Sequence, residues 1–141
     1  MCLKITRGTP YDEGNIRYKI LYPIPLYEKL PAKFCSPFRR TLWIDNRCHL
    51  GNKKISYDGV PEGSIAEEGI HVFVSQEDAK KVLLDDFNQC GPSDLGYYIC
   101  QIVKIKVSGF LAAGEHYRST DTSNGMRGEV WSEAEIVEEI Q

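Results

Sequence analysis

The chain has 141 residues, 42% of them hydrophobic and 26% charged, and a net charge of −3, which excludes disordered and fibrous classes and indicates one domain over residues 1–141. No apolar run approaches the roughly 18 residues of a membrane-spanning helix, and residues 1–20 are too charged for a signal peptide. We therefore expect a cytoplasmic protein that does not contact membranes.

The N-terminal part predicts short strands joined by irregular segments. Residues 1–15 are polar and glycine-bearing, and indicate an edge strand or a loosely held arm. Residues 17–22 are rich in aromatic and β-branched side chains, which predicts a strand. The proline-rich run 22–37 favours extended segments and turns over a helix. Residues 41–44 predict a second strand, which the pair Asp45-Asn46 closes with a turn.

The central part predicts a strand followed by a capped helix. Residues 52–68 include Gly59, Pro61 and Gly63, which mark turns, and predict a loop that could act as a lid. Residues 70–74 predict a strand. Ser75 followed by Asp78 has the spacing of a capping box, so a helix of about 76–88 should begin here. The apolar positions of this helix recur at spacings of three and four residues: Ala79, Val82, Leu83 and Phe87.

The C-terminal part predicts a long strand, a loop and a mixed end. Residues 97–111 predict a strand in which Val103, Ile105 and Val107 alternate with polar side chains, with Gly109 marking a bend or bulge. Residues 115–128 are polar and predict a mobile loop, while 129–140 predict a strand followed by a short helix. Several short strands around one clear helix, with long loops between them, predict an α+β fold with a mainly antiparallel sheet.

Charge is divided unevenly along the chain. Residues 1–60 hold 11 Lys and Arg against 5 Asp and Glu, whereas residues 61–141 hold 6 against 15. A basic half with many aromatic residues could bind nucleic acid, because phosphates need cations and bases need stacking platforms. The sequence pI of about 5.6 instead favours two halves that neutralise each other in the folded protein. We do not expect nucleic acid among the partners.

The five cysteines are scattered, and no Cys-x-x-Cys pair occurs. Free thiols are the simplest interpretation, although Cys90 and Cys100 could pair in an oxidising compartment. Cys48-His49 could supply half of a zinc site, but a structural site needs four converging ligands. We therefore predict no metal.

Three short motifs carry a resemblance. Gly-Ile-His-Val-Phe at 69–73, Glu-Asp-Ala at 77–79 and Val-x-Ile-x-Val-x-Gly at 103–109 resemble small uncharacterised α+β domains with a Gly-Phe-His-x-Phe strand, an Asp-Ala helix and a Val-x-Gly strand. The resemblance covers roughly the last half of the chain, and implies a fold but no chemistry. Our first prediction is a non-catalytic interaction or regulatory module, without a cofactor, that holds a protein partner with loops 55–68 and 115–128.

The layout is also similar to the ADP-ribosyltransferase fold, whose members bind NAD in a cleft between two small sheets. Where that family has an Arg or His that orients NAD, this chain has Tyr18-Lys19. Residues 69–73 stand in place of the central-strand motif. The segment 133–137, Glu-Ala-Glu-Ile-Val, matches the Glu-x-Glu that precedes two aliphatic residues in the family.

This second resemblance implies an NAD-dependent enzyme as the alternative function. Glu135 would hold a ribose hydroxyl and stabilise the oxocarbenium-like transition state. Glu133 would position the acceptor, His71 would contact the nicotinamide half, and Tyr18 and Lys19 would contact NAD. A solvated acidic face would equally explain the two glutamates, and a less buried face or a hydrogen-bonded core position would explain the histidine. A cleft that gathers Lys19, His71 and Glu135 would favour the enzyme.

Overall fold

The computed structural model describes residues 2–23, 34–35, 42–48, 50, 54–87, 100–117 and 123–140. The strands within these residues are β1 (Cys2–Arg7), β2 (Ile16–Pro23), β3 (Phe34–Cys35), β4 (Leu42–Ile44), β5 (Arg47–Cys48), β6 (Ile65–Ala66), β7 (Ile70–Phe73), β8 (Gln101–Tyr117) and β9 (Arg127–Ile140). Helix α1 (Gln76–Val82) continues into a π-helical turn (Leu83–Phe87).

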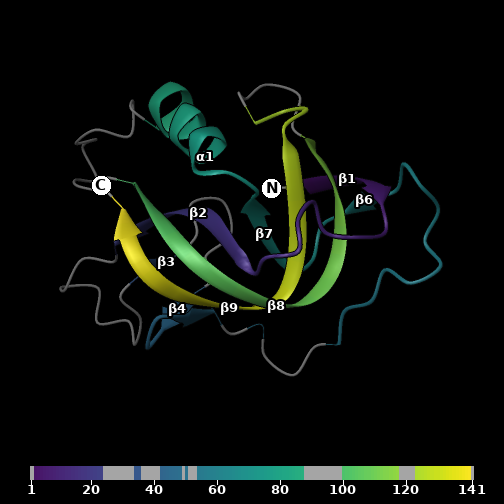
Figure 1. The fold of residues 1–141 in the computed structure, drawn as a ribbon, viewed down its shortest axis with the longest axis horizontal. Coiled ribbons are helices and arrows are strands. Elements are labelled where there is room, and N and C mark those ends of the chain that lie inside the picture. Colours follow the sequence, from purple (N-terminus) through teal and green to yellow (C-terminus); the bar gives the residue numbers. More distant parts are fainter. Residues whose placement is uncertain are drawn as a thin grey trace.

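These strands form one sheet in the order β3-β4-β5-β9-β7-β2-β8-β1-β6, and every pairing between them is antiparallel. Figure 1 shows β8 and β9 as a long, strongly curved hairpin. β9 pairs with β8 on one edge and with β7 on the other, and β2 joins β7 to β8. Because these four strands pair in a ring, the sheet closes on itself. The expected antiparallel sheet is confirmed, and helix is a minor part of the fold.

Apolar side chains pack in two main clusters. The larger draws on β2, β4, β5, β7, β8 and β9, and its buried members are Leu21, Trp43, Cys48, Ile70, Val72, Val103, Ile105, Val107, Trp131, Ala134 and Ile136. The second lies where α1 packs against β2, β7 and β8, and its buried members are Ile20, Phe73, Ala79, Val82, Cys100 and Ile102. Burial of these side chains is the main favourable term in folding.

The N-terminal segment is a firmly paired strand. Ile5 pairs with Gly114 of β8 on one side, and Leu3 pairs with Ala66 of β6 on the other. Leu3 and Ile5 are buried between outward residues, as expected of a strand with one face on the core. A strand is therefore present, but it covers only residues 2–7 and is paired on both sides, so neither the expected edge strand nor the loosely held arm describes it.

The next expected elements are found where the structure describes them. Residues 17–22 lie in β2, and 41–44 correspond to β4. Asp45 and Asn46 have φ values of 51° and 63°, as the two central residues of a type I′ hairpin turn require. Most of the proline-rich run 22–37 lies outside the described residues.

The predicted helix begins where its cap indicates but is shorter than expected. The Ser75 hydroxyl accepts a hydrogen bond from the Asp78 amide at 3.2 Å, which confirms the N-cap. The regular helix ends at Val82 rather than 88, and a π-helical turn follows. Ala79 and Val82 are buried, as the spacing predicted.

The expected loop at 115–128 is wrong at its two ends, since residues 115–117 continue β8 and residues 127–128 begin β9. Residues 123–125 form a turn, and 118–122 lie outside the described residues. Polar residues occur here because one face of the hairpin is exposed to solvent.

The expected helix at the C-terminus is also wrong, because 127–140 form a single strand. Ile105 pairs with Ile136 and Lys104 with Glu138, so Val137 is an extra, bulged residue. The bulge shifts the alternation of buried residues, which gives the sequence its mixed spacing. Backbone pairing with β8 along the strand overrides that spacing.

The bend expected at Gly109 is confirmed. Its φ is 70°, and a Cβ at this position would overlap the side chain of Ser132. Two residues further on, Leu111 bulges between Phe110 and Ala112, which pair with consecutive residues of β9. This irregular stretch of β8 lines the groove described below.

Candidate functional site

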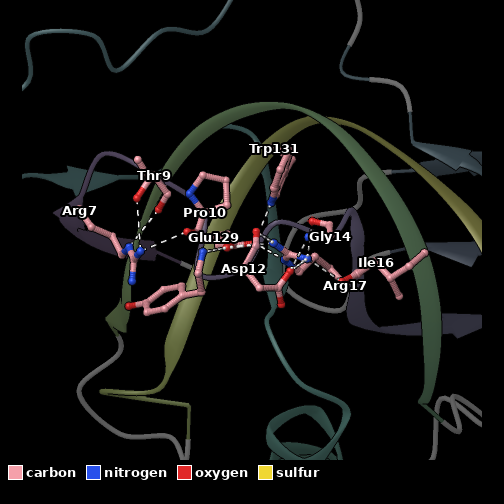
Figure 2. A network of polar contacts seen from close by, with 10 residues as sticks. Arg7, Thr9, Pro10, Asp12, Gly14, Ile16, Arg17, Glu129 and Trp131 are labelled. Atoms are coloured by element: carbon pink, nitrogen blue, oxygen red, sulfur yellow. Dashed lines mark hydrogen bonds and ion pairs between the residues drawn. The ribbon is translucent and has the colours of Figure 1, made fainter.

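A polar network surrounds a buried ion pair between Arg17 of β2 and Glu129 of β9 (Figure 2). Both side chains are fully buried. Glu129 also accepts hydrogen bonds from the Trp131 indole at 3.0 Å and from the Tyr11 amide at 2.7 Å. The Arg17 guanidinium donates to backbone carbonyls at 2.7 and 3.0 Å. The network holds the loop at residues 8–15 against the sheet. The role of the ion pair is therefore structural.

A groove of about 500 Å³ lies between β1, β8 and the turns at 57–62. The strands contribute apolar lining from Ile5, Phe110 and Leu111. Both strands are bulged here, since Thr6 is the extra residue of β1 and Leu111 that of β8. Bulges re-aim side chains and are over-represented beside active sites. We call the hollow between β1, β8 and the turns at 57–62 the groove.

The third wall of the groove is held in place by backbone hydrogen bonds. Two successive turns are closed by the Val60 amide at 3.2 Å and the Ser64 amide at 3.1 Å. The Gly63 amide donates to the Ile5 carbonyl at 2.7 Å, which joins the turns to β1. The Tyr57 hydroxyl donates to a further backbone carbonyl at 2.7 Å. The segment expected as a lid is thus a fixed wall, and the groove is preformed.

Opposite charges stand on the two sides of the groove. Arg7 lies on the β1 side, and Asp58 and Glu62 lie on the turns. Arg7 is oriented by hydrogen bonds to the carbonyls of Thr9 at 3.0 Å and Pro10 at 3.1 Å. The groove therefore suits an apolar group that is flanked by charges of opposite sign.

A second pocket of about 370 Å³ collects the two glutamates that the enzyme alternative requires. Glu133 accepts a hydrogen bond from the Ser108 hydroxyl at 2.9 Å, and Glu135 lies 3.8 Å from Arg47 in an exposed ion pair. Cys48 also lines this pocket, and burial raises the pKa of its thiol to about 11. This thiol is protonated at neutral pH and is a poor nucleophile.

His71 is a buried histidine with both ring nitrogens near backbone carbonyls, those of Ala66 at 3.0 Å and Gly69 at 3.2 Å. Burial lowers its pKa to about 4, so at neutral pH the ring is uncharged and donates to one of the two. Of the two positions considered for His71, the hydrogen-bonded core position is the one observed.

Lys19 is buried next to the same strand. Its ammonium donates to the His71 carbonyl at 2.7 Å. Burial lowers the pKa of Lys19 to about 8, while the nearby Cys48 acts weakly in the opposite direction. The Lys19 ammonium thus contacts the main chain of His71, whereas the His71 ring contacts the carbonyls of Ala66 and Gly69.

The five residues of the enzyme alternative do not share one site. Glu133 and Glu135 line the second pocket, whereas His71 and Lys19 are buried in hydrogen bonds to the backbone. Tyr18 packs, half-buried, against the cluster beneath α1. The NAD-dependent alternative therefore stays a prediction from sequence.

His116 of β8 was not singled out by the sequence. It is 1% exposed, and neither ring nitrogen has a hydrogen-bond partner in the described part of the chain. Burial, together with the nearby His71, lowers the pKa of His116 to about 3. The Val72 carbonyl offsets this shift only in part, because it lies outside hydrogen-bonding geometry. Its ring packs 4.9 Å from that of Phe73 and against Gly128. These contacts describe a core residue.

The groove was only partly visible in the sequence. The loop at 55–68 was expected to hold a partner, and its turns do line the groove. The contributions of Arg7 and Phe110 were missed, because they come from strands far apart in the chain. The one local signal was Gly109, which marks the irregular part of β8.

No family model matches the chain, and neither curated proteins nor solved structures yield a match. Within the residues that the structure describes, no three metal-binding side chains form a cluster. No helix in the same ranges is long and apolar enough to cross a membrane.

Proposed function

We propose that this protein is a non-catalytic interaction module that binds a short peptide segment of a protein partner in the groove. The observation that carries the proposal is the preformed pocket of about 500 Å³, whose mainly polar lining combines opposed charges with a few apolar side chains. Apolar surface supplies binding energy, and a few placed polar groups supply orientation. A rigid wall reduces the ordering cost on binding.

A peptide fits the groove better than a reacting substrate does. Its lining residues include no histidine, cysteine or serine, so the Ser-His and Cys-His pairs of acyl-transfer enzymes are missing from this lining. Val60, on the turns, is 37% exposed and offers an apolar contact at the rim. One or two side chains of a partner can enter, with neighbouring charges facing Arg7, Asp58 and Glu62.

Selection from a random peptide display library on the full chain tests the proposal. We expect enriched peptides to lose at least about tenfold in affinity for Val60→Asp, because the carboxylate would be desolvated beside an apolar side chain. The matched control is Val137→Asp, which changes an exposed valine of β9 outside the groove. Absence of enrichment, or equal loss in both variants, would contradict the proposal.

The NAD-dependent alternative has one observation in its favour, namely that Glu133 and Glu135 line one pocket. Incubation with labelled NAD and candidate acceptors tests it. Label transfer or NAD hydrolysis that is lost in Glu135→Gln would support an enzyme. Activity no higher than that of the Gln variant would reject it.

A further inference from the structure

A stack of charged and aromatic side chains adjoins the groove. The guanidinium carbon of Arg7 lies 4.4 Å from the centroid of the Tyr11 ring, and that of Arg127 lies 5.6 Å from it. The Tyr11 hydroxyl donates to the Gly114 carbonyl at 2.7 Å, and its amide donates to Glu129. Tyr11 is thus fixed at both ends, and two cations share one immobilised ring. We call Arg7, Tyr11 and Arg127 the arginine stack.

The cations of the arginine stack are not neutralised. Neither guanidinium forms an ion pair with any residue that the structure describes. Glu115 pairs in register with Arg127 and with Lys4, so one carboxylate stands beside two cations. The two guanidinium carbons lie at most about 10 Å apart, since both lie near the same ring centroid. Like charges within this range repel each other, and an incoming anion would relieve the repulsion.

Arg7 keeps hydrogen-bonding capacity for a ligand. Its Nε and Nη2 atoms are used within the loop, by Thr9 and Pro10, and its Nη1 atom makes no hydrogen bond within the described residues. Guanidinium groups bind carboxylate and phosphate oxygens with strong, charge-assisted hydrogen bonds. Arg7 also lines the groove, so an anion held here would adjoin a peptide bound there.

We propose that the arginine stack is an anion site that takes the carboxylate or phosphate of an acidic or phosphorylated side chain on the peptide held in the groove. This inference rests on the proposed function and specifies its ligand: an apolar side chain for the pocket and an anionic one beside it.

Titration with inorganic phosphate and with acetate, followed by NMR of the arginine Nε–H groups, tests the site without a peptide. We expect saturating shifts at Arg7 and Arg127, and at least about fivefold weaker binding in Arg127→Gln. Arg47→Gln is the matched control, since Arg47 is an exposed arginine outside both the groove and the stack. Shifts that rise linearly, or equal weakening in both variants, would overturn the site.

Groove-binding peptides carrying Asp, phosphoserine or Asn at one position test the link to the groove and the source of the anion. The Asp or phosphoserine peptide should lose at least about fivefold with Arg127→Gln, and the Asn peptide should not change. Loss that is equal for all three peptides would overturn the anion site and leave the groove proposal standing. Tighter, salt-sensitive binding of single-stranded DNA at the same arginines would overturn the peptide assignment.

Discussion

Two arginine sites adjoin Tyr11 and differ in how their positive charge is balanced: the Tyr11 amide contacts the partner of Arg17, and its ring contacts Arg7 and Arg127. Arg17 is fully buried and neutralised by Glu129, with Asp12 as a second partner at 3.1 Å. Arg7 and Arg127 are exposed and stack on the Tyr11 ring, and neither forms an ion pair within the described residues, although Glu115 lies opposite Arg127 in register. A buried charge must be paired for the chain to fold, whereas an exposed one can remain available to a ligand. The first site thus maintains structure, and the second can bind.

The largest expected effect removes the partner of the buried cation. Glu129→Gln keeps the shape of the side chain but leaves Arg17 with only the exposed carboxylate of Asp12 as counter-charge, so we expect the free energy of unfolding to fall by about 3 kcal/mol. Chemical denaturation measures this. Glu133→Gln, on the exposed face of the same strand, is the control and should change stability by less than about 0.5 kcal/mol. Similar losses of stability in both variants would contradict the structural role assigned to the buried ion pair.

Lys19 extends the comparison, because it is buried with a carbonyl as its hydrogen-bond acceptor rather than a carboxylate. Its folded-state pKa of about 8 lies below the usual 10.5, so the unfolded chain binds the proton more tightly and the folded state bears the full penalty below pH 8. We expect Lys19→Met to raise the free energy of unfolding by about 1–3 kcal/mol at pH 7. The gain should shrink between pH 8 and 10.5. Destabilisation at pH 7 would show that the hydrogen bond outweighs the charge penalty.

The two buried histidines should make the fold sensitive to acid. Their folded-state pKa values, about 4 for His71 and about 3 for His116, lie below 6.5, so the unfolded chain takes up protons first. Their contribution to stability is complete above pH 6.5, and each loses about 1 kcal/mol per pH unit as the pH falls towards 4. His116→Leu should reduce this slope in denaturation curves recorded from pH 7 to 5. An unchanged slope would mean that His116 is protonated in the folded protein.

The smallest effect is expected at the exposed stack. Arg127→Gln relieves repulsion without opening a cavity, so stability should stay within about 0.5 kcal/mol of the natural chain and rise slightly at low salt. Thermal unfolding at low and high salt measures the difference, which should vanish at high salt. A marked loss of stability would give Arg127 a structural role like that of Arg17.

Local features of the fold were predictable from sequence. Ser75 as the helix cap, the turn at Asp45-Asn46 and the bend at Gly109 each depend on a few neighbouring residues and their backbone conformations. The alternation in β8 likewise shows which face is buried. The candidate site was less predictable, since only its turns at 57–62 fell within a loop expected to bind.

The sequence by itself determined the antiparallel, strand-rich character of the protein and the start of its helix, because period-2 alternation and capping are local properties. Only the tertiary structure decided that 127–140 form one strand, since pairing with β8 outweighs the mixed spacing around Val137. It also decided which cations are neutralised. Arg17 meets Glu129 across 112 residues of chain, and ring closure of the sheet brings them together. The groove arises for the same reason, as bulges in two strands distant in sequence meet a pair of turns.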